Sequence, residues 1–292
     1  AKTLLEKIKV YEIRIQAYGA QGKTTEAVEI ALNVLKQMWL YFPDNPSHSD
    51  VDQGIEEITS SLVGREISQL ADLPLMTEIQ PLAAMRILSS TTVFAYQGNP
   101  VLFLLFVNKQ VNLSLTYGNA PLSTFSYVTY GLILCGLRED IDSGYKFGNL
   151  AKSLLSKFDI KVASAKVLET FDQLIRPWKE CIRETLQPLL KNYNFALEAG
   201  DLEFAAYAIY ANSYTAYFAG IELSKLEQQI FSNSNAIQKI NQKNVFYWNE
   251  IYRQTVLNLI DYKQSYSPLI GKAYNEEKML PLLLEKKDEV GL

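Results

Sequence analysis

The sequence predicts an all-α protein, built as a right-handed α-solenoid of antiparallel helix pairs. Three observations lead to this fold class. Apolar residues recur every three or four positions along most of the chain, which is the period of a helix face. Short turns rich in Gly, Asn and Pro separate these stretches. β-branched residues lie scattered inside the helical patterns instead of alternating, so we expect no strand.

The first helix pair is predicted within residues 2–40. One apolar stripe covers residues 2–20, Gly22 lies where a helix end favours a left-handed residue, and a second helix is expected from 26 to about 40. The spacing of large and small residues matches a tetratricopeptide unit, in which large residues of the first helix pack on a small residue of the second. The residues that carry this spacing are Tyr11, Tyr18, Gly22 and Ala27.

The same arrangement of helix, turn and helix recurs with unequal repeat lengths, which is typical of an α-solenoid. Asn99 and Pro100 follow Gly98 as a helix cap and a first helical residue, and we expect the segment Gly118, Asn119 and Pro121 to repeat this arrangement. Gly200 and Asp201 form another predicted turn, with Ala205 at a close-packing position.

Two prolines interrupt the helical pattern of residues 163–197. Because proline removes a ladder hydrogen bond, we expect a new helix to begin at Pro177, with Trp178 in its first turn and Pro188 further along. Residues 265–279 are predicted to be a loop that leads into a last helix. No long linker divides the chain, so residues 1–292 are interpreted as a single helical-repeat segment, excised from a larger multidomain signalling protein.

The composition narrows the possible functions. The net charge is −4, with 28 basic and 32 acidic residues, and no basic run is present, which argues against nucleic-acid binding. No apolar stretch is long enough for a membrane span. The two cysteines lack the spacing of a metal or redox motif and are interpreted as reduced thiols in the cytoplasm. With one histidine, His48, in a polar loop, we expect no metal site, cofactor or catalytic residue.

Residues 133–151, "ILCGLREDIDSGYKFGNLA", resemble a metal-binding or phosphate-binding site more than any other stretch of the chain does. The pair Asp140 and Asp142 does not fit a calcium loop, because glycine comes fifth and no glutamate comes twelfth. The stretch also lacks the Gly-Lys-Ser/Thr of a phosphate loop. The favoured interpretation is structural: Gly136 closes one helix, Asp140 caps the next, and Gly144, Gly148 and Ala151 form a small face for close helix packing. A ligand or metal site is the alternative.

The stretch "NPVLFLLFVNKQVNLSLTYGNAPLSTFSYVTYGLILCGLREDIDSGYKFGNLAKSLLSKF", with "IRPWKE" and "ALEAGDLEFAAYA" later, resembles the helical middle region of multi-sensor serine/threonine kinases of cyanobacterial type. These proteins join a kinase domain, a signal-transduction ATPase, a helical arm and a GAF domain. The likeness is strongest over residues 73–220, and "PLIGKAYNEEKMLPLL" near the end also resembles that region. The catalytic motifs of the family are missing here. The resemblance therefore implies a regulatory arm and transfers no catalytic residue.

Eighteen tyrosines provide the candidate binding residues. Four of them recur with helical spacing and form a stripe, namely Tyr207, Tyr210, Tyr214 and Tyr217. The other candidates are Tyr127, Tyr130 and Trp178. Two interpretations remain open, a binding surface and core packing between repeats. The expected function is a non-catalytic arm that binds a protein partner or neighbouring domains. The alternatives are a superhelical sensor with a small effector in its concave groove, and a helical enzyme, which would need an acidic or histidine cluster.

Overall fold

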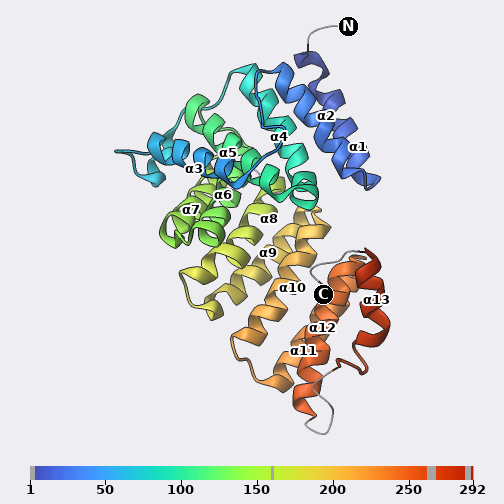
Figure 1. Ribbon diagram of the computed structural model, residues 1–292. Coiled ribbons are helices and arrows are strands. Elements are labelled where there is room, and N and C mark those ends of the chain that lie inside the picture. Colours follow the sequence, from blue (N-terminus) through green and yellow to red (C-terminus); the bar gives the residue numbers. More distant parts are fainter. Residues whose placement is uncertain (1–3, 159–160, 262–267, 287–290, 292) are drawn as a thin grey trace. The chain divides into compact units, whose positions relative to one another are not determined.

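The computed structural model describes residues 4–158, 161–261, 268–286 and 291, and within them the protein is all-α, as predicted (Figure 1). No strand occurs in these residues; two isolated β-bridges are the only extended pairings there. From the sequence, residues 1–292 are interpreted as one helical-repeat segment. Contacts between residues group this segment into two compact units, Ala1–Ala163 and Ser164–Leu292. We call them unit 1 and unit 2.

Unit 1 consists of helices that pack as successive hairpins, with α1 on α2, α4 on α5 and α6 on α7 (Figure 1). Its elements are η1 (Leu5–Lys7), α1 (Ile8–Ala20), α2 (Thr24–Gln37), α3 (His48–Ser61), η2 (Ile67–Asp72), α4 (Ile79–Gly98), α5 (Pro100–Tyr117), α6 (Ser123–Arg138) and α7 (Ile141–Phe158). The first helix pair is thus present, with a 3-10 turn before α1. Its core joins Ile15 of α1, Ala27 of α2 and Met85 of α4.

The predicted helix cap at Asn99 is confirmed, but the prediction that Asn119 caps the following helix in the same way is wrong. Asn99 accepts the Leu102 N–H at 3.0 Å. In contrast, α6 begins only at Ser123, and Asn119 does not cap it. Asn119 is buried, and its side chain donates to the carbonyl of Leu70 at 2.7 Å. Asn119 therefore joins the α5–α6 turn to η2, a role that depends on a contact distant in sequence.

The α6–α7 corner is a close helix contact, as the small-residue face predicts. An ideal Cβ on Gly144 would lie 2.4 Å from Cys135 Sγ, so only glycine fits without displacement. Asp140 accepts the Ser143 N–H at 3.0 Å and caps α7, as expected. The predicted helix end at Gly136 is wrong. Helix α6 continues to Arg138, and Glu139 takes the left-handed conformation with φ 56°.

Unit 2 contains two long hairpins, α9 on α10 and α11 on α12 (Figure 1). Its elements are α8 (Lys161–Thr170), a π turn η3 (Phe171–Ile175), η4 (Arg176–Trp178), η5 (Ile182–Thr185), α9 (Leu186–Ala199), α10 (Leu202–Phe218), α11 (Leu223–Lys239), α12 (Lys243–Ile260) and α13 (Glu276–Lys286). The turn at Gly200 and the cap at Asp201 are confirmed. No helix starts at Pro177, which lies in a 3-10 turn; α9 starts at Leu186.

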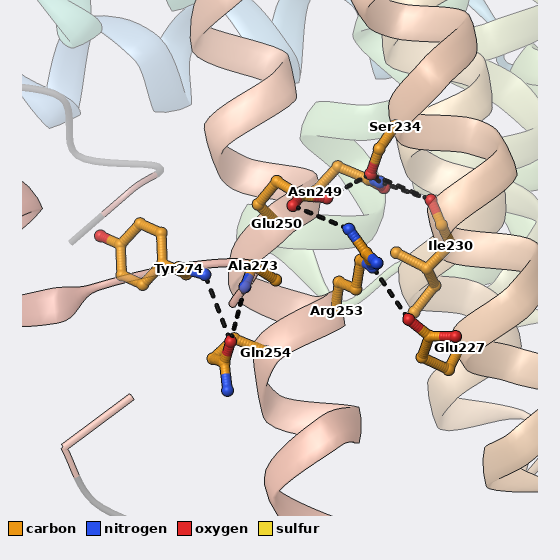
Figure 2. A network of polar contacts seen from close by, with 9 residues as sticks. All are labelled: Glu227, Ile230, Ser234, Asn249, Glu250, Arg253, Gln254, Ala273 and Tyr274. Atoms are coloured by element: carbon orange, nitrogen blue, oxygen red, sulfur yellow. Dashed lines mark hydrogen bonds and ion pairs between the residues drawn. The ribbon is translucent and has the colours of Figure 1, made fainter. Parts of the chain in front are cut away.

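A polar network fixes the contact between α11 and α12 (Figure 2). Asn249 donates to Ser234 Oγ at 2.8 Å, and the Ser234 hydroxyl donates to Glu250. Arg253 binds both Glu227 and Glu250, at 3.0 and 3.2 Å. Because these side chains are buried or largely buried, their mutual hydrogen bonds replace contacts with water; the exception is Asn249 Oδ1, which has no hydrogen-bond partner in the described residues. The network gives the hairpin one register.

The same helix α12 holds the segment before α13. Gln254 is buried, and its Oε1 accepts the N–H groups of Ala273 and Tyr274 at 2.9 and 3.3 Å (Figure 2). An ideal Cβ on Gly271 would lie 2.3 Å from Gln254 Nε2, so the backbone passes close to this side chain. The predicted loop before the last helix is present in residues 268–275, and residues 265–267 lie outside the described residues. Its predicted end at residue 279 is wrong, because α13 already begins at Glu276.

Candidate functional site

The predicted tyrosine stripe lies along α10 in unit 2. Tyr207, Tyr210, Tyr214 and Tyr217 are all half-buried, while the residues between them supply the buried side of the helix. Ala205, packed with Ala165 of α8 and Ala196 of α9, lies on that buried side. Most of each tyrosine therefore contacts the protein, and a smaller part remains available to solvent.

Helix α12 completes this stripe with two further aromatic residues. Trp248 stacks on Tyr207 with ring centroids 6.3 Å apart and an interplanar angle of 11°. Tyr252 contacts Tyr210, Tyr214 and Tyr217 with centroids 6.1, 5.9 and 5.9 Å away. We call these six residues of α10 and α12 the aromatic face. Each ring is held by its neighbours, so the face is ordered before anything binds to it.

Phenol hydroxyls give the aromatic face a polar edge. The hydroxyl of Tyr207 donates to Glu203 Oε1 at 2.9 Å. Burial raises the pKa of Tyr207, Tyr214 and Tyr252 above the ordinary value of a tyrosine. These phenols consequently stay neutral near pH 7 and can donate hydrogen bonds.

A buried acid lies on α8, the neighbouring helix. Glu169 is 4% exposed, and its Oε1 has no hydrogen-bond partner among the described residues. Burial, and then the charge of Asp172, raises the pKa of Glu169 to about 8. The charge of Glu169 in turn contributes to the raised pKa of Tyr207 and of Tyr214, which places the carboxyl group on the α10 side of α8.

The other predicted binding residues lie elsewhere. Tyr127 and Tyr130 lie on α6 in unit 1 and are 0% and 1% exposed, so they belong to the interior. The interpretation of these two residues as part of a binding surface is therefore wrong. Both pack on Phe147 of α7, with centroids 5.9 and 4.9 Å away. Trp178 is 57% exposed on the turn η4, and no ring contact joins it to the aromatic face in the described part of the chain.

Sequence reasoning missed two parts of this surface. Trp248 and Tyr252 stand out as aromatic residues of one segment, yet no local pattern pairs α12 with α10. Glu169 carries no signal, because an acid within a helical stretch is ordinarily a solvated residue. Only the packing of α8 and α12 around α10 reveals both.

No known protein family matches the chain, and a search of curated proteins finds no significant relative. The described residues include no helix with the length and apolar character that a bilayer crossing requires. They also contain no group of three His, Cys, Asp or Glu side chains placed to hold a metal ion. The aromatic face itself offers apolar contact, π faces and hydroxyl donors.

Proposed function

We propose that this chain is a non-catalytic docking arm, which binds an extended segment of a partner protein or of a neighbouring domain on the aromatic face. The helix hairpins of each unit support an arrangement as a tetratricopeptide-like, right-handed solenoid. The resemblance in residues 73–220 supports a place in a multi-sensor serine/threonine kinase, between its ATPase and its sensor modules.

The observation that carries the proposal is the ordered aromatic face. Tyrosine and tryptophan contribute large contact areas at low cost in side-chain entropy, and they are enriched among residues that dominate binding energies. The four rings of α10 span ten residue steps, about 15 Å at 1.5 Å per residue. An extended peptide of about five residues covers that length.

The polar edge adds direction to this contact. An extended segment exposes backbone carbonyls along its length, and neutral phenols donate hydrogen bonds to such acceptors. The hydroxyls of Tyr207 and Tyr214 are already engaged by Glu203 and Gln173, which leaves Tyr252 as the donor to consider first. A partner that prefers one packing of the helices would shift the arm toward it by its differential affinity.

The test is peptide selection against the whole chain, followed by fluorescence anisotropy with selected peptides. We expect Tyr210→Ala and Tyr252→Ala to weaken binding at least about tenfold, since each removes a central ring. Tyr96→Ala is the matched control, because Tyr96 is an exposed aromatic residue of α4 in unit 1. Equal affinity of the parent and both face variants for every selected peptide would refute docking on this face.

A further inference from the structure

Unit 1 contains a cleft of about 160 Å³ between α3 and α5. Residues of both helices line it, together with the segment 41–43 that precedes α3. Sites for drug-sized molecules measure about 300–1,000 Å³, so this cleft suits a smaller ligand. It belongs to unit 1, whereas the aromatic face belongs to unit 2, so a ligand here is independent of docking on that face.

Asn108 of α5 is the unusual group in this cleft. It lines the cleft and is 3% exposed. Its Nδ2 donates to the carbonyl oxygen of Val51 at 3.2 Å, which fixes the orientation of the amide. The other polar atom, Oδ1, is buried and has no hydrogen-bond partner among the described residues. Because buried acceptors are ordinarily hydrogen-bonded, this oxygen calls for a donor from outside the chain.

Gly54 of α3 faces Asn108 across the contact between the two helices. An ideal Cβ on Gly54 would lie 2.7 Å from Asn108 Nδ2 and 3.3 Å from Asn108 Cβ. Because position 54 has no side chain, the amide reaches the α3 backbone, and the wall of the cleft beside it stays open.

Two acids of α3 also line the cleft, and Glu57 is the more available of them. Asp50 is engaged in the cap of α3. The two oxygens of Glu57 accept only long hydrogen bonds, at 3.4 Å each, from Gln53 and Asn112. Asn112 lies one helical turn beyond Asn108. The Glu57 carboxylate is therefore on the same side of α5 as the unbonded acceptor.

Lys109 of α5 adds a positive charge to this lining. It is half-buried and forms no ion pair within the described ranges. A ligand with only a positive charge would meet this lysine, and a ligand with only a negative charge would meet the two acids. A zwitterion can place each of its charges beside the opposite one. The mixed lining therefore favours a ligand that carries both charges.

The remaining lining includes apolar surface. Phe42, Pro43 and Leu105 contribute hydrocarbon to the cleft. The ring of Phe42 packs edge-on against Phe106, with centroids 4.9 Å apart, which holds it in place. A ligand with an apolar side chain would use this surface as well as the polar groups.

We infer that the cleft binds a small α-amino acid with an apolar side chain. Its ammonium group donates to Asn108 Oδ1 and is attracted by Glu57, while its carboxylate is attracted by Lys109. Its side chain lies against Phe42 and Leu105. Such an amino acid would be an effector that binds unit 1, at a site separate from the aromatic face.

Isothermal titration calorimetry of the whole chain with L-leucine and L-valine tests the inference. We expect saturable binding of at least one of them, with one site per chain. Two analogues of leucine each lack one charge: 3-methylbutan-1-amine retains the ammonium group, and 4-methylpentanoate retains the carboxylate. Both should bind at least about tenfold more weakly than leucine. No saturable binding of either amino acid would mean that water satisfies Asn108, and it would overturn the assignment, as would equal binding of either analogue.

Three variants locate the site. Asn108→Leu should weaken binding about tenfold, because it removes an acceptor for a charged donor. Glu57→Gln and Lys109→Gln should each weaken binding about threefold, as expected for partly exposed charges. Glu56→Gln is the matched control and should leave binding unchanged, since Glu56 is an exposed acid of α3 that does not line the cleft.

An Asn108→Leu protein that melts like the parent and binds leucine equally well would refute the role of this acceptor. If that variant does not fold, the two charge variants decide, because both leave the buried amide in place. Unchanged affinity in Glu57→Gln and in Lys109→Gln would refute the assignment of a zwitterion to this cleft.

Discussion

The hydroxyl of Tyr127 donates to Asn119 Oδ1 at 3.0 Å, and so joins helix α6 to the turn before it. The side-chain nitrogen Nδ2 of Asn119 donates to the Leu70 carbonyl oxygen at 2.7 Å. Gly118, the residue before Asn119, has φ 96°, and an ideal Cβ there would lie 2.2 Å from the carbonyl oxygen of Pro74. One buried amide thus connects three segments of unit 1, which explains why Tyr127 is interior.

Tyr127 and Tyr130 provide a matched pair of tyrosines one turn apart on α6. Tyr127→Phe leaves Asn119 Oδ1 without its donor, so we expect a loss of about 1–2 kcal/mol in the free energy of unfolding. Tyr130→Phe removes a hydroxyl with no hydrogen-bond partner in the described residues, so we expect no loss. Urea denaturation of both variants measures the difference. Equal destabilisation would contradict the distinction between a bonded and an unbonded phenol.

Gly144→Ala should destabilise unit 1, although alanine normally favours a helix over glycine by about 1 kcal/mol. The added Cβ would lie 2.4 Å from Cys135 Sγ and 2.6 Å from the Gly131 carbonyl oxygen. Overpacking of this kind costs about 1–3 kcal/mol. Thermal melting measures the effect.

Gly136→Ala is the control on the partner helix α6. Gly136 is exposed, and its added Cβ meets nothing within 4 Å. This variant should raise stability by about 0.5–1 kcal/mol. If both glycine variants stabilise the protein, the α6–α7 contact is looser than described.

Glu169 should make the stability of unit 2 depend on pH. Its pKa is about 8 in the folded protein against an ordinary value of 4.5, so the folded state keeps a proton that the unfolded state has released. The free energy of unfolding therefore falls as the pH rises from about 5 to about 8. Glu169→Gln removes this titration, so its stability relative to the parent should increase over that window, by an amount on the order of 3 kcal/mol.

Denaturation curves at pH 5, 6.5 and 8 measure this pH dependence. Glu56→Gln, at an exposed acid of α3, serves as the control and should follow the parent across the window. Parallel curves for Glu169→Gln and the parent would show that Glu169 is ionised in both the folded and the unfolded states.

Gln254→Met should release the segment before α13. The substitution retains the length of the side chain and removes the acceptor for the Ala273 and Tyr274 N–H groups. We expect hydrogen exchange at these two amides to become at least about tenfold faster, because their closed state loses its hydrogen bonds. The amide of Gly200, in the α9–α10 turn, should exchange as in the parent. Unchanged exchange at Ala273 and Tyr274 would mean that other contacts hold the segment.

The purified chain should hydrolyse no ATP and phosphorylate no substrate. Phosphoryl transfer needs a phosphate-binding loop, a lysine and metal-binding acids in one place. The sequence contains Gly22-Lys23-Thr24, but Ala17 stands where the Gly-x-x-x-x-Gly-Lys-Ser/Thr pattern of such a loop has its first glycine, and the helix α1 rather than a strand precedes it. Incubation with labelled ATP, against a boiled sample, measures this. Turnover that survives a second purification step would contradict the non-catalytic function.

The local parts of the fold could be predicted because their causes are local. The period of apolar residues, the cap at Asn99 and the turn at Gly200 depend on residues within about four positions of one another. Predictions failed where distant residues compete. Asn119 has the sequence of a cap but binds Leu70. Gly136 has the composition of a helix end but lies within α6, which extends to the left-handed Glu139.

The sequence by itself determined that the chain is helical, that α6 and α7 meet at small residues, and that tyrosines line one side of α10. The tertiary structure alone decided which aromatic residues are accessible, because burial depends on the helices that pack around each ring. Tyr127 and Tyr210 have similar helical surroundings in sequence, yet α7 and the α5–α6 turn enclose the first, whereas α12 covers only one side of the second. The orphan oxygen of Glu169 and the cleft beside Asn108 have the same origin, since each arises where residues distant in sequence converge.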